Sequence, residues 1–385
     1  MAHWIAHLDG GPRRVNHAAV SVGDHIYSFG GYCTGGNYEQ LDPIDAFVFS
    51  IGRSKWSPIT YGNQPSECPR HLPFQRYGHS VVAEKDKIYL WGGRNDTSGA
   101  DNKLYAFDTK TSRWMLESPR GHLPDATDGH TACVIGNRMY VFGGFIDLMQ
   151  SYSNLTYALD FREMKWTLLQ PKGGEVPHWR DFHTATPFGD HMYVFGGRSD
   201  VSGPWYTGRE FYCNRLKMFD TRNSQWLTPR ATGDEPIGRR SHSAVLYDNH
   251  LCVFGGFNHT IDTHFNDLHK LDLSSMEWKK VECKGKIPCK RRRQCCIVHR
   301  DRMIMFGGTS PREKYIPGGS PGENLIDLAD LHILDFEPSL KTMCQMTIIN
   351  EKIDPSCLPK TLRWEIAAMT TNSDISQPCE ATQQG

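Results

Sequence analysis

The stretch HSVVAEKDKIYLWGG, residues 79–93, decides the fold because its pattern returns along the whole chain. Each copy ends in paired glycines after an apolar residue. The first glycines of the six pairs stand at positions 30, 92, 143, 196, 255 and 307, so successive pairs are 62, 51, 53, 59 and 52 residues apart. A period near 50 residues is typical of arrays in which each repeat forms one supersecondary unit.

Other residues repeat in register with the glycines. Thirteen residues before each first glycine stand His17, His79, His130, His183, His242 and Gln294. Three residues earlier stand Arg14, Arg76, Thr127, Arg180, Arg239 and Arg291. An alternating segment such as LYAFD (104–108) follows each doublet, and alternation marks a half-buried strand. The repeat therefore predicts about four strands per unit, which is one blade of a propeller.

The tryptophans predict how the ring closes. Trp56, Trp114, Trp166, Trp226 and Trp278 each follow one of the first five doublets, and no Trp takes that place after the sixth. Trp4 stands 52 residues before Trp56, which is one repeat. We therefore expect the N-terminal strand to supply the outer strand of the sixth blade, which leaves no open sheet edge.

Composition narrows the classes of partner. Lys plus Arg and Asp plus Glu are both 43 in 385 residues, so no bulk charge favours nucleic acid or a lipid surface. No apolar run is long enough for a membrane span, and the N-terminus has no signal-peptide pattern. We expect the 12 cysteines to be reduced thiols of a cytoplasmic protein. The basic run 290–293 is an alternative signal for import into the nucleus. No metal or cofactor motif is present, so we expect neither group.

These repeats resemble the kelch family over residues 1–337. The resemblance implies an all-β, six-bladed kelch propeller closed by the N-terminal strand. We interpret the recurring histidines as structural, hydrogen-bonded inside each blade, rather than as catalytic bases. The first arginines, such as Arg239 and Arg291, are interpreted as pairing between blades, and Thr127 puts that pairing in doubt for its own blade.

A different pattern follows residue 337. Apolar or small residues at spacings of three and four predict a helix after Ser339, which is a plausible N-cap, and a second helix after residue 358. Leu340, Cys344 and Ile348 resemble an elongin-binding box. Leu358, Pro359, Leu362 and Ile366 resemble the cullin-2 box that follows such a box. We therefore expect a helical binding segment at 338–369, followed by a flexible tail at 370–385. The alternative is a small helical bundle that only packs on the propeller.

The two boxes behind a kelch ring resemble a family of receptors for cullin–RING ubiquitin ligases that read C-terminal glycine. That resemblance implies a non-catalytic adaptor whose partners are elongin B, elongin C, cullin-2, a RING subunit and proteins ending in glycine. Arg is the side chain best suited to bidentate binding of a carboxylate. Arg240 and Arg292 occupy equivalent positions in adjacent blades, so they and Ser241 are our candidates for binding the terminal carboxylate. The other candidate pocket residues are Tyr77, Asp128, Arg180, Asp181, Arg198, Trp205 and Arg293.

Two other functional classes stay open. One is a kelch scaffold, cytoskeletal or chromatin-associated, with no role in ubiquitination. The other is a propeller enzyme such as a copper oxidase or a sialidase. The chain also ends in Gly385, so we expect that its own tail could compete for the pocket and cause self-association.

Overall fold

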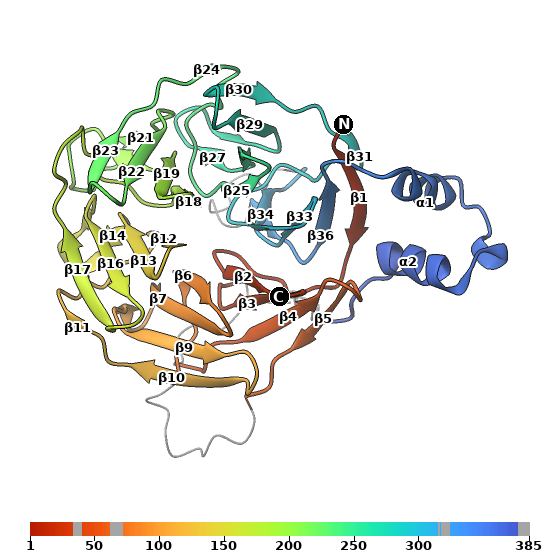
Figure 1. The fold of residues 1–385 in the computed structure, drawn as a ribbon, viewed down its shortest axis with the longest axis horizontal. Coiled ribbons are helices and arrows are strands. Elements are labelled where there is room, and N and C mark those ends of the chain that lie inside the picture. Colours follow the sequence, from red (N-terminus) through yellow and green to blue (C-terminus); the bar gives the residue numbers. More distant parts are fainter. Residues whose placement is uncertain (34–40, 62–71, 315, 317–323, 376–385) are drawn as a thin grey trace.

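The computed structural model is a ring of six β-sheets with two helices projecting from one side (Figure 1). It describes residues 1–33, 41–61, 72–314, 316 and 324–375. Each sheet is one blade, and its strands lie side by side in order from the central axis to the outer wall. The prediction of a six-bladed β-propeller with a small helical segment is confirmed.

The blades begin with β2, β6, β12, β18, β25 and β32 nearest the axis. The first blade contains β2 (Ala18–Val22), β3 (His25–Phe29), β4 (Ala46–Ser50) and β5 (Lys55–Pro58), and the second contains β6 (Tyr77–Glu84), β7 (Lys87–Asn95), β9 (Leu104–Asp108) and β10 (Arg113–Glu117). The third blade contains β12 (Thr131–Ile135), β13 (Arg138–Phe142), β16 (Thr156–Asp160) and β17 (Lys165–Leu169), and the fourth contains β18 (Thr184–Phe188), β19 (His191–Phe195), β22 (Lys217–Asp220) and β23 (Gln225–Leu227). The fifth blade contains β25 (Ser243–Tyr247), β26 (His250–Phe254), β29 (Leu268–Asp272) and β30 (Glu277–Lys280), and the sixth contains β32 (Cys295–His299), β33 (Arg302–Phe306) and β36 (Leu331–Asp335).

Short strands complete the sheets and the loops that follow the glycine doublets. Three of them come from the connection between blades and pair in parallel with an outer strand: β11 (Arg120–Gly121), β24 (Thr232–Gly233) and β31 (Lys284–Gly285). The others form the rim of one face: β8 (Gly99–Ala100), β14 (Phe145–Ile146), β15 (Ser151–Tyr152), β20 (Ser199–Asp200), β21 (Glu210–Phe211), β27 (Phe257–Asn258), β28 (Thr263–His264), β34 (Thr309–Pro311) and β35 (Leu325–Asp327). We call this face the mouth.

The N-terminal strand β1 (His3–Leu8) closes the ring, as the tryptophan spacing predicts. It pairs antiparallel with β36, and Trp4 lies opposite Leu334. The sixth blade thus contains the first and the last strands of the propeller. Joining them gives both strands a hydrogen-bonded partner, so closure leaves no gap in the ring.

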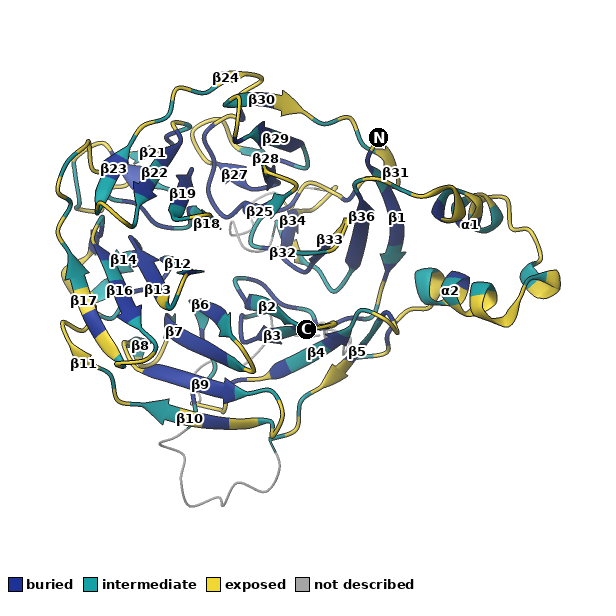
Figure 2. Ribbon diagram, viewed as in Figure 1, coloured by how far each residue is buried: buried dark blue, intermediate teal, exposed yellow. Residues whose placement is uncertain are grey.

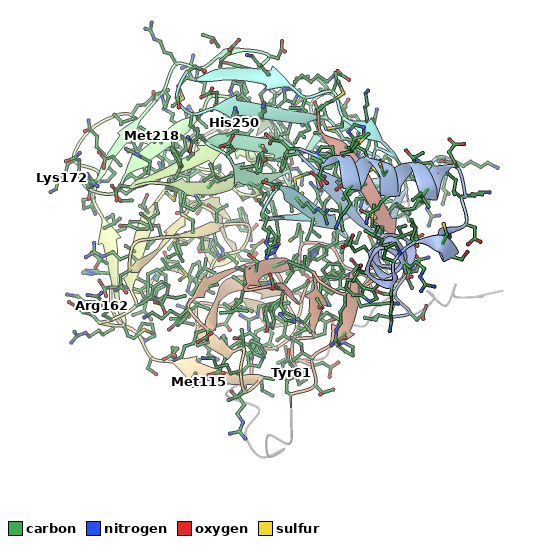
Figure 3. The ribbon with its side chains drawn as sticks, turned by 45° about the vertical axis from the view of Figure 1, so that its right-hand side comes forward. Tyr61, Met115, Arg162, Lys172, Met218 and His250 are labelled. Atoms are coloured by element: carbon green, nitrogen blue, oxygen red, sulfur yellow. The ribbon has the colours of Figure 1, made fainter. Side chains whose placement is uncertain are left out.

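Side chains between neighbouring sheets form the core. Figure 2 shows that buried residues run along the strands of the blades. Along β10, for example, Trp114 is buried while its neighbour Met115 faces solvent, as expected for a strand with one face on the core. Figure 3 shows Met115 of β10, Arg162 and Lys172 at the outer wall of the ring. The buried tryptophans of the outer strands pack against the sheet of the preceding blade, as Trp114 does with Phe29 and Trp226 with Phe142, so they join neighbouring blades.

The first arginine of each motif is structural, but its side chain pairs inside its own blade rather than between blades. Arg76 donates from Nη1 to the carbonyl of Gly92 at 3.1 Å and from Nη2 to Asp101 at 3.0 Å. Arg239 and Arg291 form the same two kinds of bond within their blades. Our expectation of inter-blade side-chain pairing was therefore wrong.

Backbone atoms at this position provide the link between blades. The second glycine of each doublet donates its N–H to the carbonyl of the first motif residue in the next blade, and this includes Gly93 to Thr127 at 2.9 Å. The doubt about Thr127 is thereby resolved, because its carbonyl makes the bond whatever its side chain. The same bond from Gly308 to Arg14 closes the circle at 2.9 Å.

The recurring histidines also join blades, contrary to the interpretation that they bond inside one blade. Nε2 of His130 lies 2.8 Å from the hydroxyl of Ser80, and His183 and His242 meet Thr131 and Thr184 in the same way. Each imidazole packs on the first glycine of the preceding doublet: a Cβ on Gly92 would lie 2.4 Å from Cε1 of His130. That close approach, together with a φ of +70°, explains why glycine is required there.

The two helices are α1 (Leu340–Asn350) and α2 (Lys360–Thr370), with a 3₁₀ turn at Pro355–Cys357 between them. Ser339 caps α1 as predicted, because its side chain accepts the N–H of Thr342 at 3.1 Å. Glu365 of α2 holds α1 through Lys341 at 2.8 Å. α2 packs on β1, so the helices are attached to the ring rather than separate from it.

Residues 371–375 return to the ring, so the prediction of a flexible tail from residue 370 is wrong for this stretch. Ser373 and Ile375 donate their N–H groups to the carbonyls of Asp9 and Gly10, at 2.9 and 2.8 Å. Ser373 also meets the N–H of Trp56 in β5 at 3.4 Å. The segment 371–375, which we call the strap, thus ties the helices to the first blade. Residues 376–385, including Gly385 and its expected self-association, lie outside the described residues.

Candidate functional site

Six residues surround the axis just before the recurring histidines, and we call them the inner ring. Each donates its N–H to the carbonyl of the ring residue in the preceding blade, at 2.7–3.3 Å, and the series closes on itself. The inner ring consists of Asn16, Gly78, Gly129, Phe182, Ser241 and Arg293. All six have positive φ, between 49° and 67°. These residues, the five histidines that follow five of them and Gln294 line a cavity of about 120 Å³.

The residues immediately before the inner ring form a second circle, the bridge layer. Each one pairs through its backbone with the residue that follows a glycine doublet in its own blade, such as Arg240 with Phe257. This pairing fixes the side chains of both residues at the mouth. The bridge layer consists of Val15, Tyr77, Asp128, Asp181, Arg240 and Arg292.

The mouth has a basic sector built from Arg240, Ser241, Arg292 and Arg293. Arg240 is 9% exposed and donates from Nε to the Tyr212 hydroxyl at 3.2 Å. The Arg292 guanidinium stacks on the Phe257 ring at 4.3 Å from its centroid. The structure therefore brings the three predicted carboxylate-binding residues together, with Arg293 beside them.

No carboxylate forms an ion pair with these cations within the described ranges. None of the three guanidinium groups forms an ion pair there, and Nε of Arg292, Nε of Arg293 and Oγ of Ser241 have no hydrogen-bond partner. Burial, followed by repulsion from Arg293 and Arg240, lowers the pKa of Arg292 to about 9. Burial and the same arginines lower the pKa of nearby His264 to about 3. Uncompensated buried charge is costly, so this sector is suited to an anionic ligand.

An acidic sector lies across the mouth. Asp181 is fully buried and binds Arg198 through both carboxylate oxygens, so its charge is already neutralised. Asp128 is 5% exposed, and its Oδ1 has no partner among the described residues. Burial and the neighbouring Asp181 raise the pKa of Asp128 to about 7. Of the two predicted acids, only Asp128 is available to a cationic group.

Aromatic side chains form the rim beside the acidic sector. Trp205 and Tyr206 stand on the loop after β20, which hydrogen-bonds through Tyr206 to Gln150 in the neighbouring blade. Trp205 is 59% exposed, so it can contact a ligand that extends out of the mouth. Tyr77 lies on the opposite side, where its hydroxyl donates to Asp96 at 2.7 Å.

Arg180 does not belong to the mouth, and that prediction is wrong. Its side chain is fully buried in the fourth blade, where Nη1 donates to the carbonyl of Gly196 at 2.8 Å. Nε donates to the carbonyl of His178 at 3.0 Å. The residue is the motif arginine of its blade, so its side chain points between strands and not toward a ligand.

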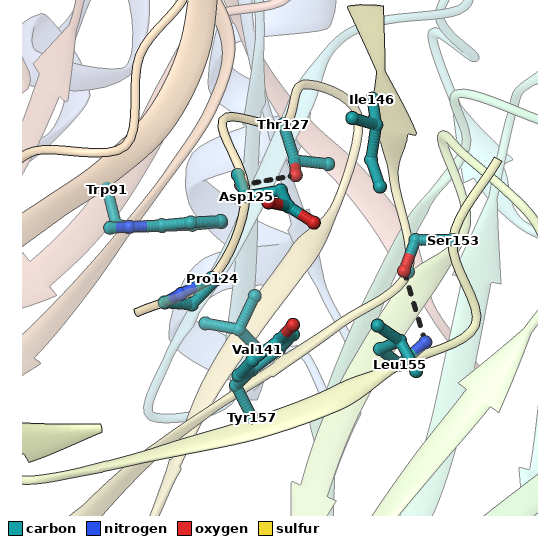
Figure 4. Close-up of a pocket in the computed structure, with 10 residues that line it drawn as sticks. Trp91, Pro124, Asp125, Thr127, Val141, Ile146, Ser153, Leu155 and Tyr157 are labelled. Carbon is teal, nitrogen blue, oxygen red and sulfur yellow. Dashed lines mark hydrogen bonds between the residues drawn. The ribbon is translucent and has the colours of Figure 1, made fainter. Parts of the chain in front are cut away.

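A small cavity in the third blade shows what the motif arginine normally fills (Figure 4). Its volume is about 10 Å³, and Thr127, Gly143 and Ser153 are among its lining residues. Thr127 and Ser153 stand where the second blade has the buried pair Arg76 and Asp101. Thr127 instead donates to the carbonyl of Asp125 at 2.7 Å. Trp91 of the second blade also lines this cavity, which therefore lies between two sheets at the place where the other blades have an arginine side chain.

The outer face of α1 carries the predicted elongin-binding residues. Leu340 is 81% exposed and Cys344 is also exposed, while Ile348 is half-buried. Leu340 and Cys344 therefore lie on one exposed face of α1. This arrangement agrees with a docking face but does not identify the partner.

The predicted cullin-binding residues divide into two groups. Pro359 is exposed, and Leu358 and Leu362 are half-buried. Ile366 is 7% exposed on a helix that packs on β1, so its side chain is not presented to a partner. The prediction that Ile366 contacts cullin is therefore wrong for this arrangement.

One group of side chains in the described part of the chain has metal-ligand spacing: His7, Asp330 and His332, where β1 meets β36. Asp330 is bound by Arg291 at 2.7 Å, and its oxygen also meets His332 at 2.8 Å. A cation there would face the Arg291 guanidinium, so these residues favour a hydrogen-bonded seam. No helix of the described chain is long and apolar enough to span a membrane.

Several residues of the mouth escaped the sequence analysis. They are Phe182, Tyr212, Phe257 and His264. Phe257 follows a glycine doublet, so alignment of the repeats could have found it. Tyr212 and His264 lie in loops whose length differs from blade to blade, and no repeated spacing marks them.

Comparison with known proteins identifies the family to which the chain belongs. A family model described as the KLHDC2/KLHL20/DRC7 Kelch-repeats domain matches residues 16–173 and 78–308. Kelch domain-containing protein 3 of Homo sapiens is 51% identical over 380 residues, which covers 98% of each chain. The chain belongs to this kelch family. The protein of the same name from Bos taurus is equally similar, at 51% over 384 residues. Host cell factor 2 of Homo sapiens is 30% identical over 63% of this kelch chain.

Proposed function

We propose that this kelch protein is the substrate-binding subunit of a cullin-2 RING ubiquitin ligase and binds proteins that end in glycine. The observation that carries the proposal is the basic sector. Nε of Arg292 and Oγ of Ser241 have no hydrogen-bond partner among the described residues, Arg240 lies buried beside them, and a terminal carboxylate offers two oxygens to this group. The protein itself would perform no catalysis, because it only holds the substrate for the ligase.

The helical segment supplies the second half of the proposal. Leu340 and Cys344 share one exposed face, to which elongin C would bind, with elongin B, cullin-2 and the RING subunit assembled behind it. Because α2 packs on β1, the docking face and the mouth belong to one body. Such an arrangement would hold a bound substrate at a fixed position relative to the ligase.

Peptide binding tests the mouth. A peptide ending in glycine should lose on the order of 2–5 kcal/mol of binding free energy when its C-terminus is amidated, and Arg292→Met should cost a similar amount. Arg162→Met, on the outer wall, is the matched control and should change nothing. Equal affinity for the acid and the amide would refute carboxylate recognition.

Elongin capture tests the helical segment. Leu340→Asp should abolish co-purification of elongin B and elongin C without changing the melting temperature, because the side chain has few contacts to lose. Leu148 at the mouth is 94% exposed, so Leu148→Asp is a control with the same chemistry elsewhere. Retention of elongins by the Leu340 variant would leave the kelch scaffold as the better reading.

A further inference from the structure

Tyr212 links the fourth blade to the basic sector of the mouth. It follows β21 in the fourth blade, and its hydroxyl lies between Glu210 of the same blade and Arg240 of the fifth. Its main chain is packed closely against the fifth blade, because a Cβ on Gly238 would lie only 2.1 Å from the carbonyl oxygen of Tyr212. The tyrosine is therefore held between two blades, in contact with one of the candidate carboxylate-binding residues.

The direction of the two hydrogen bonds follows from the chemistry of the partners. A guanidinium only donates hydrogen bonds, and an ionised carboxylate only accepts them. Arg240 therefore donates from Nε to the Tyr212 hydroxyl at 3.2 Å, and the hydroxyl donates in turn to Glu210. Burial raises the pKa of Tyr212 to about 12, so the hydroxyl keeps its proton at neutral pH. Glu210 also pairs with Nη1 of Arg198 at 3.5 Å, so the acceptor at the end of this chain is itself held in place.

This chain of hydrogen bonds decides which part of Arg240 can meet a ligand. The donors of a guanidinium form a rigid fork, so a carboxylate can be held either by Nη1 and Nη2 or by Nε and one Nη. Tyr212 occupies Nε, which leaves the two Nη groups. Neither of them has a hydrogen-bond partner among the described residues. Arg240 is therefore prepared to bind a carboxylate through the end of its fork.

We propose that Tyr212 is a positioning residue for the carboxylate of the ligand, an inference that rests on the proposed function. By holding Nε, it directs Nη1 and Nη2 of Arg240 together toward the ligand, which Tyr212 itself does not touch. Without the hydroxyl, the guanidinium can turn about its side-chain bonds, and Nε loses its acceptor. Binding must then fix an orientation that the folded protein no longer provides, and this ordering weakens binding.

Tyr212→Phe tests the proposal because it removes only the hydroxyl. One peptide ending in glycine is prepared as the free acid and as the C-terminal amide, and fluorescence anisotropy measures the affinity of both for the full chain. The variant should bind the acid roughly tenfold more weakly, a loss typical of removing an outer hydrogen-bond partner of a binding residue. Its affinity for the amide should be unchanged, because the amide lacks the second oxygen that the Nη pair would hold.

Tyr152→Phe is the matched control. Tyr152 in β15 is also buried, but its hydroxyl has no hydrogen-bond partner among the described residues. This variant should leave both affinities unchanged. A second comparison places Tyr212→Phe in an Arg240→Met background, where it should cause no further loss because the tyrosine acts through that arginine.

Three results would overturn the inference. Tyr212→Phe could retain the full preference for the acid, or it could weaken the acid peptide equally with and without Arg240. It could also weaken both peptides alike and lower the melting temperature, which would make the role of Tyr212 structural. In all three cases an acid preference of the unmodified protein leaves the proposed function standing. If the unmodified protein binds acid and amide equally, the proposed function fails and this inference fails with it.

Discussion

The third blade offers a direct test of how the motif arginine stabilises a blade. Thr127→Arg combined with Ser153→Asp should rebuild there the pair that Arg76 and Asp101 form in the second blade, where Nη2 and the carboxylate are 3.0 Å apart. The acceptors for the new guanidinium are already in place. The carbonyl of Asp125 now accepts the Thr127 hydroxyl, and Gly143 lines the cavity.

The magnitude follows from burial. Arg76 is fully buried and Asp101 is 10% exposed, so the rebuilt pair would be shielded from water. Thr127→Arg alone should lower the free energy of unfolding by about 3–5 kcal/mol, because it buries an unpaired charge. Adding Ser153→Asp should recover part of that loss, giving a coupling energy of about 1–3 kcal/mol.

Urea denaturation followed by tryptophan fluorescence would measure this double-mutant cycle. The reverse cycle in the second blade, Arg76→Thr with Asp101→Ser, should give coupling of the same sign. If the two substitutions in the third blade add within about 0.5 kcal/mol, the side chains do not meet and the proposed equivalence of the two blades is wrong.

Three further predictions concern other parts of the ring. Ala18→Ser should raise the melting temperature by adding a hydroxyl partner worth about 0.5–1.5 kcal/mol for His79, whose ring nitrogens have none in the described structure; an unchanged melting temperature would contradict it. Burial raises the pKa of Asp128 to about 7 from an ordinary value near 3.8, so the folded state retains this proton longer than the unfolded chain, and stability is lost as pH rises between those values. Asp128→Asn should remove that loss, so its advantage in chemical denaturation should grow from pH 4 to pH 7 and then level off; an advantage independent of pH would argue against the raised pKa. Gly10→Ala should loosen the strap and speed hydrogen exchange in β5, because a Cβ would lie 1.5 Å from the Ser373 carbonyl oxygen. Gly23→Ala is the control, because Gly23 also has a positive φ but a Cβ there would meet nothing within 4 Å. Equal exchange in both variants would mean that the strap does not protect the β5 edge.

The sequence is sufficient to predict the ring and its closure, because both depend on spacing. The glycine doublets recur at one position per blade, and Trp4 replaces the tryptophan missing from the sixth repeat. The partners of the repeated side chains could not be predicted in the same way. Arg239 has its acceptors in its own blade and His242 has its partner in the preceding blade, and a one-dimensional period does not distinguish these directions.

The mouth was partly predictable for a related reason. Arg240 and Arg292 stand out because two adjacent repeats carry the same charge at the same position. Phe182 shares only a backbone conformation with its equivalents, which include Gly129 and Ser241, so no residue pattern marks it. Ile366 fits a helical pattern equally well whether its face is covered by the ring or by a partner, and only the packing of α2 decides.

The inner ring has a consequence for how such a mouth can change over evolution. Its six N–H groups and six carbonyls satisfy one another, so a ligand gains little by approaching the backbone there. What a ligand meets is the set of side chains mounted on that circle, and each can be exchanged without removing a backbone hydrogen bond. The six backbone positions of the inner ring stay fixed. Two of them are glycines and carry no side chain, and one carries the phenyl group of Phe182. New ligand preferences can therefore arise by substitution of one inner-ring residue at a time while the propeller stays the same.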